Sequence, residues 1–219
     1  MSLLKLTMTP FTTTTNASER ADLNPLADTP PPGMRALARA DIEGWVTLWR
    51  GPEALQNGLR WQDAAGLIWN QPGLRATLLL RLAHALWRAH VPALPGMVAR
   101  YNLSKHGLDV PPSVEIGPGL YVPHPVGTVV TARRIGARVS LISGITIGMR
   151  QTPEFPVLGD DVYVGAGARI LGAVIVGDGA SVGANAVVLA DVPPGATAVG
   201  IPARVKLPKN SPKREEEAL

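Results

Sequence analysis

The sequence predicts a mainly β protein, a parallel β-helix of triangular cross-section preceded by a small α-helical region. Two observations indicate this fold: aliphatic residues recur every six positions in the C-terminal half, and a glycine follows many of them. A period of six fits neither the turn of an α-helix nor the alternation of a plain strand. It fits a three-sided coil in which each side points one aliphatic residue at a shared axis. The series are Leu158, Val164, Ile170, Val176, Val182 and Val188; Val129, Ile135, Leu141 and Ile147; and Val110, Ile116 and Val122.

The part of the chain before these repeats divides into two segments. Residues 1–36 contain a threonine run and a proline run without an apolar period, so we expect a disordered segment. Residues 37–105 have a helical pattern, with shorter helices expected over 41–49 and 61–69. The clearest stripe, at spacings of three and four, is Leu74, Leu78, Leu82, Ala85 and Leu86.

The β-helix is expected over residues 106–207, followed by a charged tail over 208–219. The repeat is interrupted twice. Seven residues, not six, separate Val122 from Val129, and eleven separate Ile147 from Leu158. The second gap is polar and contains prolines, so it predicts a protruding loop over 149–157, where binding groups concentrate.

Composition narrows the class of protein. The chain has 219 residues, and 21 Lys and Arg against 17 Asp and Glu give a net charge of +4. The cations near the C-terminus are followed by Glu215, Glu216 and Glu217 in the same tail, so we expect a solvated tail and no nucleic-acid partner. The chain has no cysteine, which removes disulfides and thiolate metal sites and fits the cytoplasm. We expect no membrane span and no secretion signal.

His124 is the one histidine within the repeats, and it lies where the period first slips. Asp109 precedes it by fifteen residues, just under one three-sided turn, so a hydrogen bond between carboxylate and imidazole is geometrically feasible. Such a pair would act as a general base and its orienting group. A surface histidine and a separate capping aspartate are the alternative reading.

Two further features bear on ligands. The run Gly165–Ala168 is matched eighteen residues later by Gly183–Ala186, so small residues would stack on one edge. They either leave backbone N–H groups open to an extended ligand or only allow tight packing. A metal site is not expected, because the repeats offer one histidine, no cysteine and no carboxylate cluster.

Together these residues resemble the bacterial serine acetyltransferases, which are left-handed β-helix, hexapeptide-repeat acyltransferases. The resemblance rests on Asp109 and His124 at their spacing, on the loop at 149–157, on Gly200–Arg204, and on the helix motif Arg81-x-x-His84-x-x-Trp87. It covers about residues 70–207.

The resemblance implies an acetyl-CoA-dependent O-acetyltransferase with no metal. His124 would be the general base and Asp109 its partner, acting on a small hydroxyl acceptor such as serine. The protein would be a homotrimer with the ligand cleft between subunits, and pairing into hexamers stays open. The residues implied to contact acetyl-CoA are Ala166, Gly167 and Ala184 through the backbone, and Arg204 and Lys206 through its phosphates.

Two departures from the family pattern leave the acceptor open. Pro123 stands where the family usually has an aspartate that binds the serine amine, and Glu154-Phe155-Pro156 stands where it has Arg-His-Pro. A saccharide acceptor, as in surface-polysaccharide acetyltransferases, is therefore the main alternative. A non-catalytic trimeric scaffold and a metal-dependent hydratase are the others.

Overall fold

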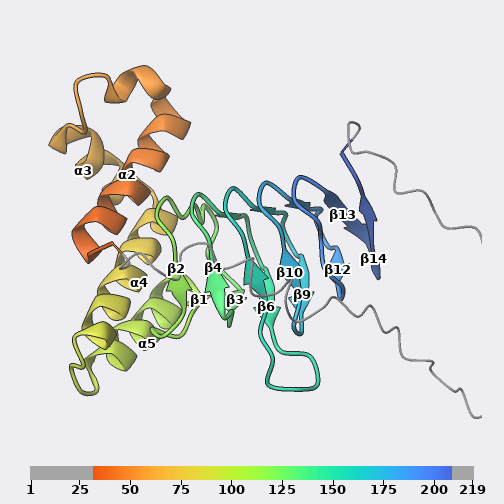
Figure 1. Cartoon of the computed structure of the whole chain (residues 1–219). Coiled ribbons are helices and arrows are strands. Elements are labelled where there is room, and N and C mark those ends of the chain that lie inside the picture. The colour runs from red at the N-terminus through yellow and green to blue at the C-terminus, as the bar shows by residue number, and fades with distance from the viewer. Residues whose placement is uncertain (1–31, 209–219) are drawn as a thin grey trace, which may run out of the picture. The chain divides into compact units, whose positions relative to one another are not determined.

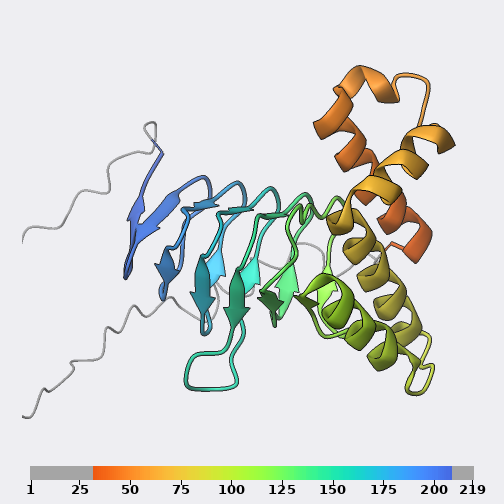
Figure 2. The same ribbon diagram turned by 180° about the vertical axis from the view of Figure 1, so that it is seen from behind.

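The structure, a computed structural model, describes residues 32–208. Most of the N-terminal segment and of the charged tail expected from the sequence therefore lies outside the described residues. Within residues 32–208, no helix has both the length and the apolar character that crossing a membrane requires. The described part is a run of helices followed by a parallel β-helix (Figures 1 and 2).

The helices extend further in both directions than the sequence pattern indicated. The first begins at Met34, and an additional helix ends at His106, next to the first strand. Apart from His106, this last helix lies within the helical region expected over 37–105, where no separate helix was named for it. Pro95 lies in its first turn, where a missing N–H is tolerated. The helices are α2 (Met34–Arg50), η1 (Pro52–Leu55), α3 (Trp61–Asn70), α4 (Pro72–Arg88) and α5 (Leu94–His106).

The strands form three parallel sheets, and the chain visits the sheets in turn, as a three-sided coil requires. The first sheet contains β1 (Leu108–Asp109), β3 (Thr128–Val130), β6 (Thr146–Gly148), β9 (Arg169–Leu171) and β12 (Val187–Val188). The second contains β2 (Glu115–Ile116), β4 (Arg134–Ile135), β7 (Val157–Leu158) and β10 (Ile175–Val176). The third contains β5 (Ser140–Leu141), β8 (Tyr163–Val164), β11 (Ser181–Val182), β13 (Thr197–Gly200) and the antiparallel β14 (Ala203–Lys206).

The six-residue period marks the axis of the β-helix, which confirms the predicted fold. The series from Leu158 to Val188 is buried throughout, and it belongs to one continuous apolar core. One position was assigned wrongly. Val129 is 37% exposed, and its neighbour Val130 is fully buried. Strand β3 buries Thr128 and Val130 and turns Val129 outward, because successive side chains of a strand face opposite sides.

Helix α4 closes the start of this core. Its Ala76 and Leu80 belong to the same apolar cluster as the β-helix residues. The stripe predicted from Leu74 and Leu78 faces a second cluster instead, around Trp45 and Leu67 of α2 and α3. The helix therefore has two buried faces. The face toward the β-helix also includes a buried glycine, Gly73, which the apolar pattern in the sequence did not mark.

Candidate functional site

His124 lies at the corner where the chain leaves the third sheet and enters the first. Its side chain is exposed, and its backbone pairs with Ser143 of the next coil in a parallel bridge. We call this edge the His124 corner; it comprises residues 122–127, 142–145, 165–168 and 183–186. Hydrogen bonds fix its register: Gly167 donates to the carbonyl of Ser143 at 2.8 Å, and Asn185 donates to that of Ala166 at 2.8 Å.

The small residues predicted to contact a ligand share this corner with His124. Ala166 and Ala184 are exposed at equivalent positions of successive coils, and Gly167 is half-buried. Among residues 32–208, the backbone N–H groups of Ala166 and Ala184 donate no hydrogen bond. An exposed, unpaired N–H is satisfied by water or by a ligand. The corner thus presents a row of amide donors beside an exposed imidazole.

Asp109 lies in β1, on the outer side of the first sheet, where it pairs in register with Val129. It is exposed. The segment before it touches the histidine's coil, since Gly127 donates a hydrogen bond of 3.1 Å to the carbonyl of Gly107. In the described part of the chain, no hydrogen bond or ion pair joins Asp109 to His124. Asp109 lies on the first sheet, and His124 lies on the next coil, at the corner that leads into this sheet.

The loop between β6 and β7 leaves the β-helix as the sequence indicated (Figure 1). Residues Met149–Glu154 are exposed, Phe155 is half-buried, and Pro156 is buried where the chain rejoins the coil. The Thr152 hydroxyl lies 3.1 Å from a carboxylate oxygen of Glu154 and donates to it. Glu154 therefore places negative charge on the exposed part of the loop.

Arg204 and Lys206 lie on β14, at the opposite end of the β-helix from the helices. Arg204 pairs with Val199 and Lys206 with Thr197, and both side chains are exposed. Val199 in turn packs close to Gly183 of the His124 corner, since a Cβ at Gly183 would lie 2.8 Å from it. The cations are thus near the last coil of the corner, within reach of a long, flexible ligand.

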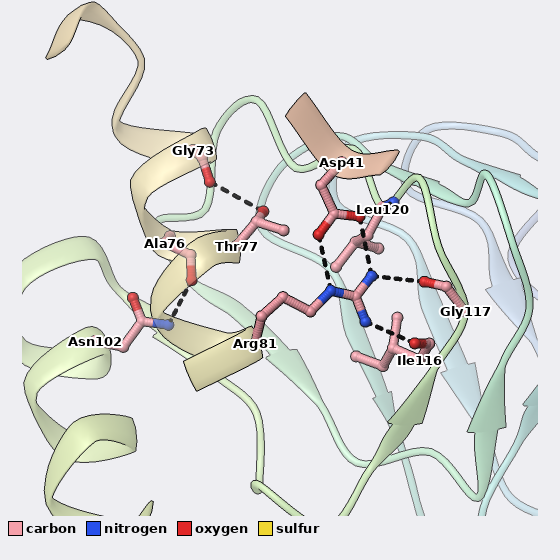
Figure 3. A network of polar contacts seen from close by, with 9 residues as sticks. All are labelled: Asp41, Gly73, Ala76, Thr77, Arg81, Asn102, Ile116, Gly117 and Leu120. Carbon is pink, nitrogen blue, oxygen red and sulfur yellow. Dashed lines mark hydrogen bonds and ion pairs between the residues drawn. The ribbon is translucent and has the colours of Figure 1, made fainter. Parts of the chain in front are cut away.

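A buried polar network that the sequence reasoning missed joins the helices to the first coil (Figure 3). Arg81 of α4 forms an ion pair with Asp41 of α2 and donates 2.6 Å hydrogen bonds to the carbonyl oxygens of Ile116 and Gly117. Asp41 also accepts a 2.9 Å hydrogen bond from the N–H of Leu120. Arg81 of the helix motif noted in the sequence therefore has a structural role, since it connects α2 and α4 to the first coil of the β-helix. Its acidic partner lies forty residues away in the chain, and nothing in the sequence connects them.

A groove of about 620 Å³ runs between α2 and the outer face of the third sheet, beside the His124 corner. Tyr121, Ser140 and Tyr163 line it from the sheet. Its two charged side chains are already paired: Glu43 with Arg39, and Arg138 with Asp161. The Arg138 guanidinium lowers the pKa of the Asp161 carboxyl by its hydrogen bond. The groove thus offers aromatic rings and hydroxyl groups and no unpaired charge of its own.

No group of three or more side chains suited to a metal ion occurs within residues 32–208. The His124 corner itself presents an exposed imidazole beside backbone amides. An imidazole in its neutral form accepts a proton from a hydroxyl group. Amide N–H groups bind carbonyl oxygens and stabilise negative charge that develops on them.

Comparisons with known proteins show which proteins this chain resembles. The bacterial transferase hexapeptide family (six repeats) matches residues 155–190. The serine acetyltransferase of Helicobacter pylori (strain ATCC 700392 / 26695) is 41% identical over 139 residues, which is 61% of this chain and 80% of that protein. The serine acetyltransferase of Mycobacterium tuberculosis (strain ATCC 25618 / H37Rv) is 36% identical over 146 residues, which is 65% of this chain and 64% of that protein.

Solved structures show the same likeness. The soybean serine acetyltransferase complexed with serine superimposes with a TM-score of 0.69 at 35% identity, covering 80% of this chain and 70% of that one. A serine acetyltransferase in complex with CoA gives a TM-score of 0.68 at 32% identity, covering 79% and 69%.

Proposed function

Since the chain belongs to the serine acetyltransferase family, we propose that it transfers the acetyl group of acetyl-CoA to a hydroxyl group, with His124 as the general base. The chain is an acyltransferase by this membership. The observation that carries the assignment of the site is the alignment of His124, Ala166 and Ala184 along one corner. The identity of the base and of the acetyl-CoA contacts is our proposal.

In this mechanism, the neutral imidazole of His124 takes the proton of the acceptor hydroxyl as its oxygen attacks the thioester carbonyl. The carbonyl oxygen becomes negative in the tetrahedral intermediate, and a backbone N–H stabilises it. The intermediate collapses to the acetyl ester, and the C–S bond breaks. The imidazolium returns its proton to the leaving thiolate of CoA, so the histidine is neutral again. Asp109 would support the cationic imidazolium from the neighbouring coil.

Acetyl-CoA would lie along the His124 corner as a substrate. The free N–H groups of Ala166 and Ala184, with Gly167 between them, suit the amide carbonyls of the pantetheine arm. Arg204 and Lys206 are exposed cations near the last coil and suit the phosphates. An exposed corner holds an extended ligand better when a second subunit covers it, which supports a homotrimer with closed symmetry. We place the reaction in the cytoplasm, which is one of the compartments that contain acetyl-CoA.

Serine is the acceptor that the relatives' names and the serine complex of the soybean enzyme support. A saccharide is the second candidate, because a specific feature favours it. The amine and carboxylate of serine each need an opposite charge, and the groove charges Glu43 and Arg138 already have partners. Pro123 is uncharged, and the loop carries Glu154. Two tyrosines and a serine in the groove suit a sugar ring.

A panel of acceptors tests the proposal. The full chain is incubated with acetyl-CoA and, separately, L-serine, monosaccharides and nucleotide sugars, and free CoA thiol is followed over time. Thiol release that depends on an acceptor establishes the transferase, and the acceptor with the highest kcat/KM decides between the two candidates. No release with any acceptor would refute acetyl transfer.

A further inference from the structure

Helix α4 lies against the coil that leads to His124, and one face of the helix supplies a series of contacts with it. The residues of this face, at spacings of three and four, are Gly73, Ala76, Leu80, Arg81 and His84. Ala76 and Leu80 enter the core, Arg81 binds the carbonyls of Ile116 and Gly117, and the ring of His84 lies 2.9 Å from the carbonyl oxygen of Pro112. The helix is therefore fixed along about 16 Å, the rise of the eleven residue steps from Gly73 to His84.

The first residue of this face, Gly73, meets the backbone just before His124. Gly73 is buried in the first turn of α4. A Cβ at this position would overlap the carbonyl oxygen of Val122 and lie 2.9 Å from that of Pro123. Both obstacles are backbone atoms, so a side-chain rotation cannot relieve the overlap. Only glycine lets the helix come this close.

The backbone around His124 is held on both sides, and its side chain is not. Before it, the N–H of Tyr121 bonds to the carbonyl of Val139 at 2.9 Å, and the Tyr121 ring packs on Trp45 with centroids 4.7 Å apart. After it, the N–H of Thr128 bonds to the carbonyl of Pro125 at 3.0 Å. Among the described residues, the imidazole of His124 makes no hydrogen bond. The position of the ring therefore follows from the path of residues 122–125.

We propose that Gly73 is a positioning residue, which sets the distance between α4 and the Val122–Pro123 backbone and thereby places the His124 imidazole for proton transfer. The proposal rests on the proposed function for the role of His124 in catalysis. The Thr77 hydroxyl stabilises the same turn, since it donates a 3.1 Å hydrogen bond to the carbonyl of Gly73. Displacement of a catalytic group by about 1 Å lowers the rate about 100-fold.

The test compares Gly73→Ala with the wild type. We expect kcat to fall about 100-fold, while KM for acetyl-CoA stays within about twofold, because Ala166 and Ala184 lie on other coils. In the His124→Ala background, Gly73→Ala should lower kcat no further, because the group that it displaces is gone. Additive losses in this double-mutant cycle would overturn the proposal.

Two control variants separate positioning from loss of stability. Leu80→Ala removes side-chain atoms from the same helix face and adds none near the carbonyls of Val122 and Pro123; we expect a lower Tm and an unchanged kcat well below that temperature. Gly96→Ala places a Cβ in α5 where no atom lies within 4 Å and should resemble the wild type. If Gly73→Ala does not fold, Thr77→Val loosens the same turn, and we expect a severalfold loss in kcat.

A measurement that needs no turnover keeps this proposal separate from the proposed function. The ring signals of His124 in the NMR spectrum are assigned by comparison with His124→Ala. We expect Gly73→Ala to shift them and Leu80→Ala to leave them in place. A wild type without acetyl transfer would refute the proposed function alone, whereas unshifted His124 signals would overturn the positioning role of Gly73.

Discussion

Arg81 and Asp41 form a bidentate ion pair at the interface between the helices and the β-helix. The Nε and Nη2 atoms of Arg81 lie 2.8 and 3.0 Å from the two carboxylate oxygens of Asp41, and the side chains are 2% and 0% exposed. The remaining donors of the arginine reach backbone carbonyls of the first coil (Figure 3). A buried charge without its partner is strongly unfavourable, so the interface depends on both members.

We predict that Asp41→Ala lowers the free energy of unfolding by about 3–5 kcal/mol, because it leaves the arginine buried and unpaired. Urea unfolding followed by circular dichroism measures this change. Glu43→Ala is the matched control, because it breaks the exposed Arg39–Glu43 pair on the same helix and should alter stability by less than about 1 kcal/mol. Equal effects of the two substitutions would contradict the assigned role of the buried pair.

The repeat in the sequence was sufficient to predict the β-helix, because each coil places one aliphatic residue at the axis and the period survives in the chain. The prediction erred where the period slips. The series that restarts after the seven-residue gap placed Val129 in the core. In β3 the side chains alternate in direction, so Thr128 and Val130 are buried and Val129 is exposed. Apart from His106, helix α5 lies within the helical region expected over 37–105, but its bounds were not predicted, because Pro95 and Gly96 disfavour a helix interior and are acceptable in a first turn.

This register correction is itself testable with two adjacent valines. Val130→Ala removes two buried methyl groups and should lower the free energy of unfolding by about 2 kcal/mol. Val129→Ala, one residue earlier on the exposed side, should change it by less than about 0.5 kcal/mol. Thermal or urea unfolding of both variants measures these changes. A larger loss of stability for Val129→Ala than for Val130→Ala would restore the assignment of Val129 to the core.

The residues of the proposed site could be named from the sequence, whereas the contacts between the helices and the β-helix could not. His124 was found because it interrupts the period, and Ala166 and Ala184 because they recur eighteen residues apart. The contacts that hold the corner were not predictable. Asp41 and Arg81 are forty residues apart, and Gly73 resembled an ordinary residue of a helix start. These contacts depend on how the helices dock, which a repeat pattern does not encode.

Replacing His124 tests the mechanism most directly. We predict that His124→Ala lowers kcat by ~10²–10⁴-fold, the usual contribution of a general base. Because the side chain is exposed and unbonded among the described residues, the Tm should stay close to that of the wild type. Asp109→Asn should reduce kcat less, since Asp109 acts through the histidine. Wild-type turnover by His124→Ala would refute the role of His124.

Substitution at the small residues of the corner should affect binding and not chemistry. We predict that Ala184→Leu raises KM for acetyl-CoA about tenfold with kcat little changed, because a bulky side chain blocks a contact made equally in the ground and transition states. Steady-state kinetics at varied acetyl-CoA concentration measures both constants. The same substitution at the exposed Ala190, outside the corner, is the control. A loss in kcat alone would argue against this path for the ligand.

The buried His106 at the end of α5 should make stability depend on pH. Burial lowers the pKa of its imidazole, and the nearby positive charges of Arg75 and Lys105 add to this effect. The unfolded chain therefore takes up a proton near pH 6.5, roughly its ordinary pKa, before the folded chain does. We predict that the free energy of unfolding is highest above that pH and falls as the pH drops from about 7 to about 5.

The lowered carboxyl pKa values of Asp63 and Asp161 act in a separate range, below about pH 4, so they do not obscure the change. Urea unfolding at a series of pH values tests the prediction. His106→Gln should flatten the dependence between about pH 7 and 5. Ser104→Ala, an exposed change in the same turn, should keep the wild-type slope. If His106→Gln retained that slope, the pH dependence would have to arise from another group.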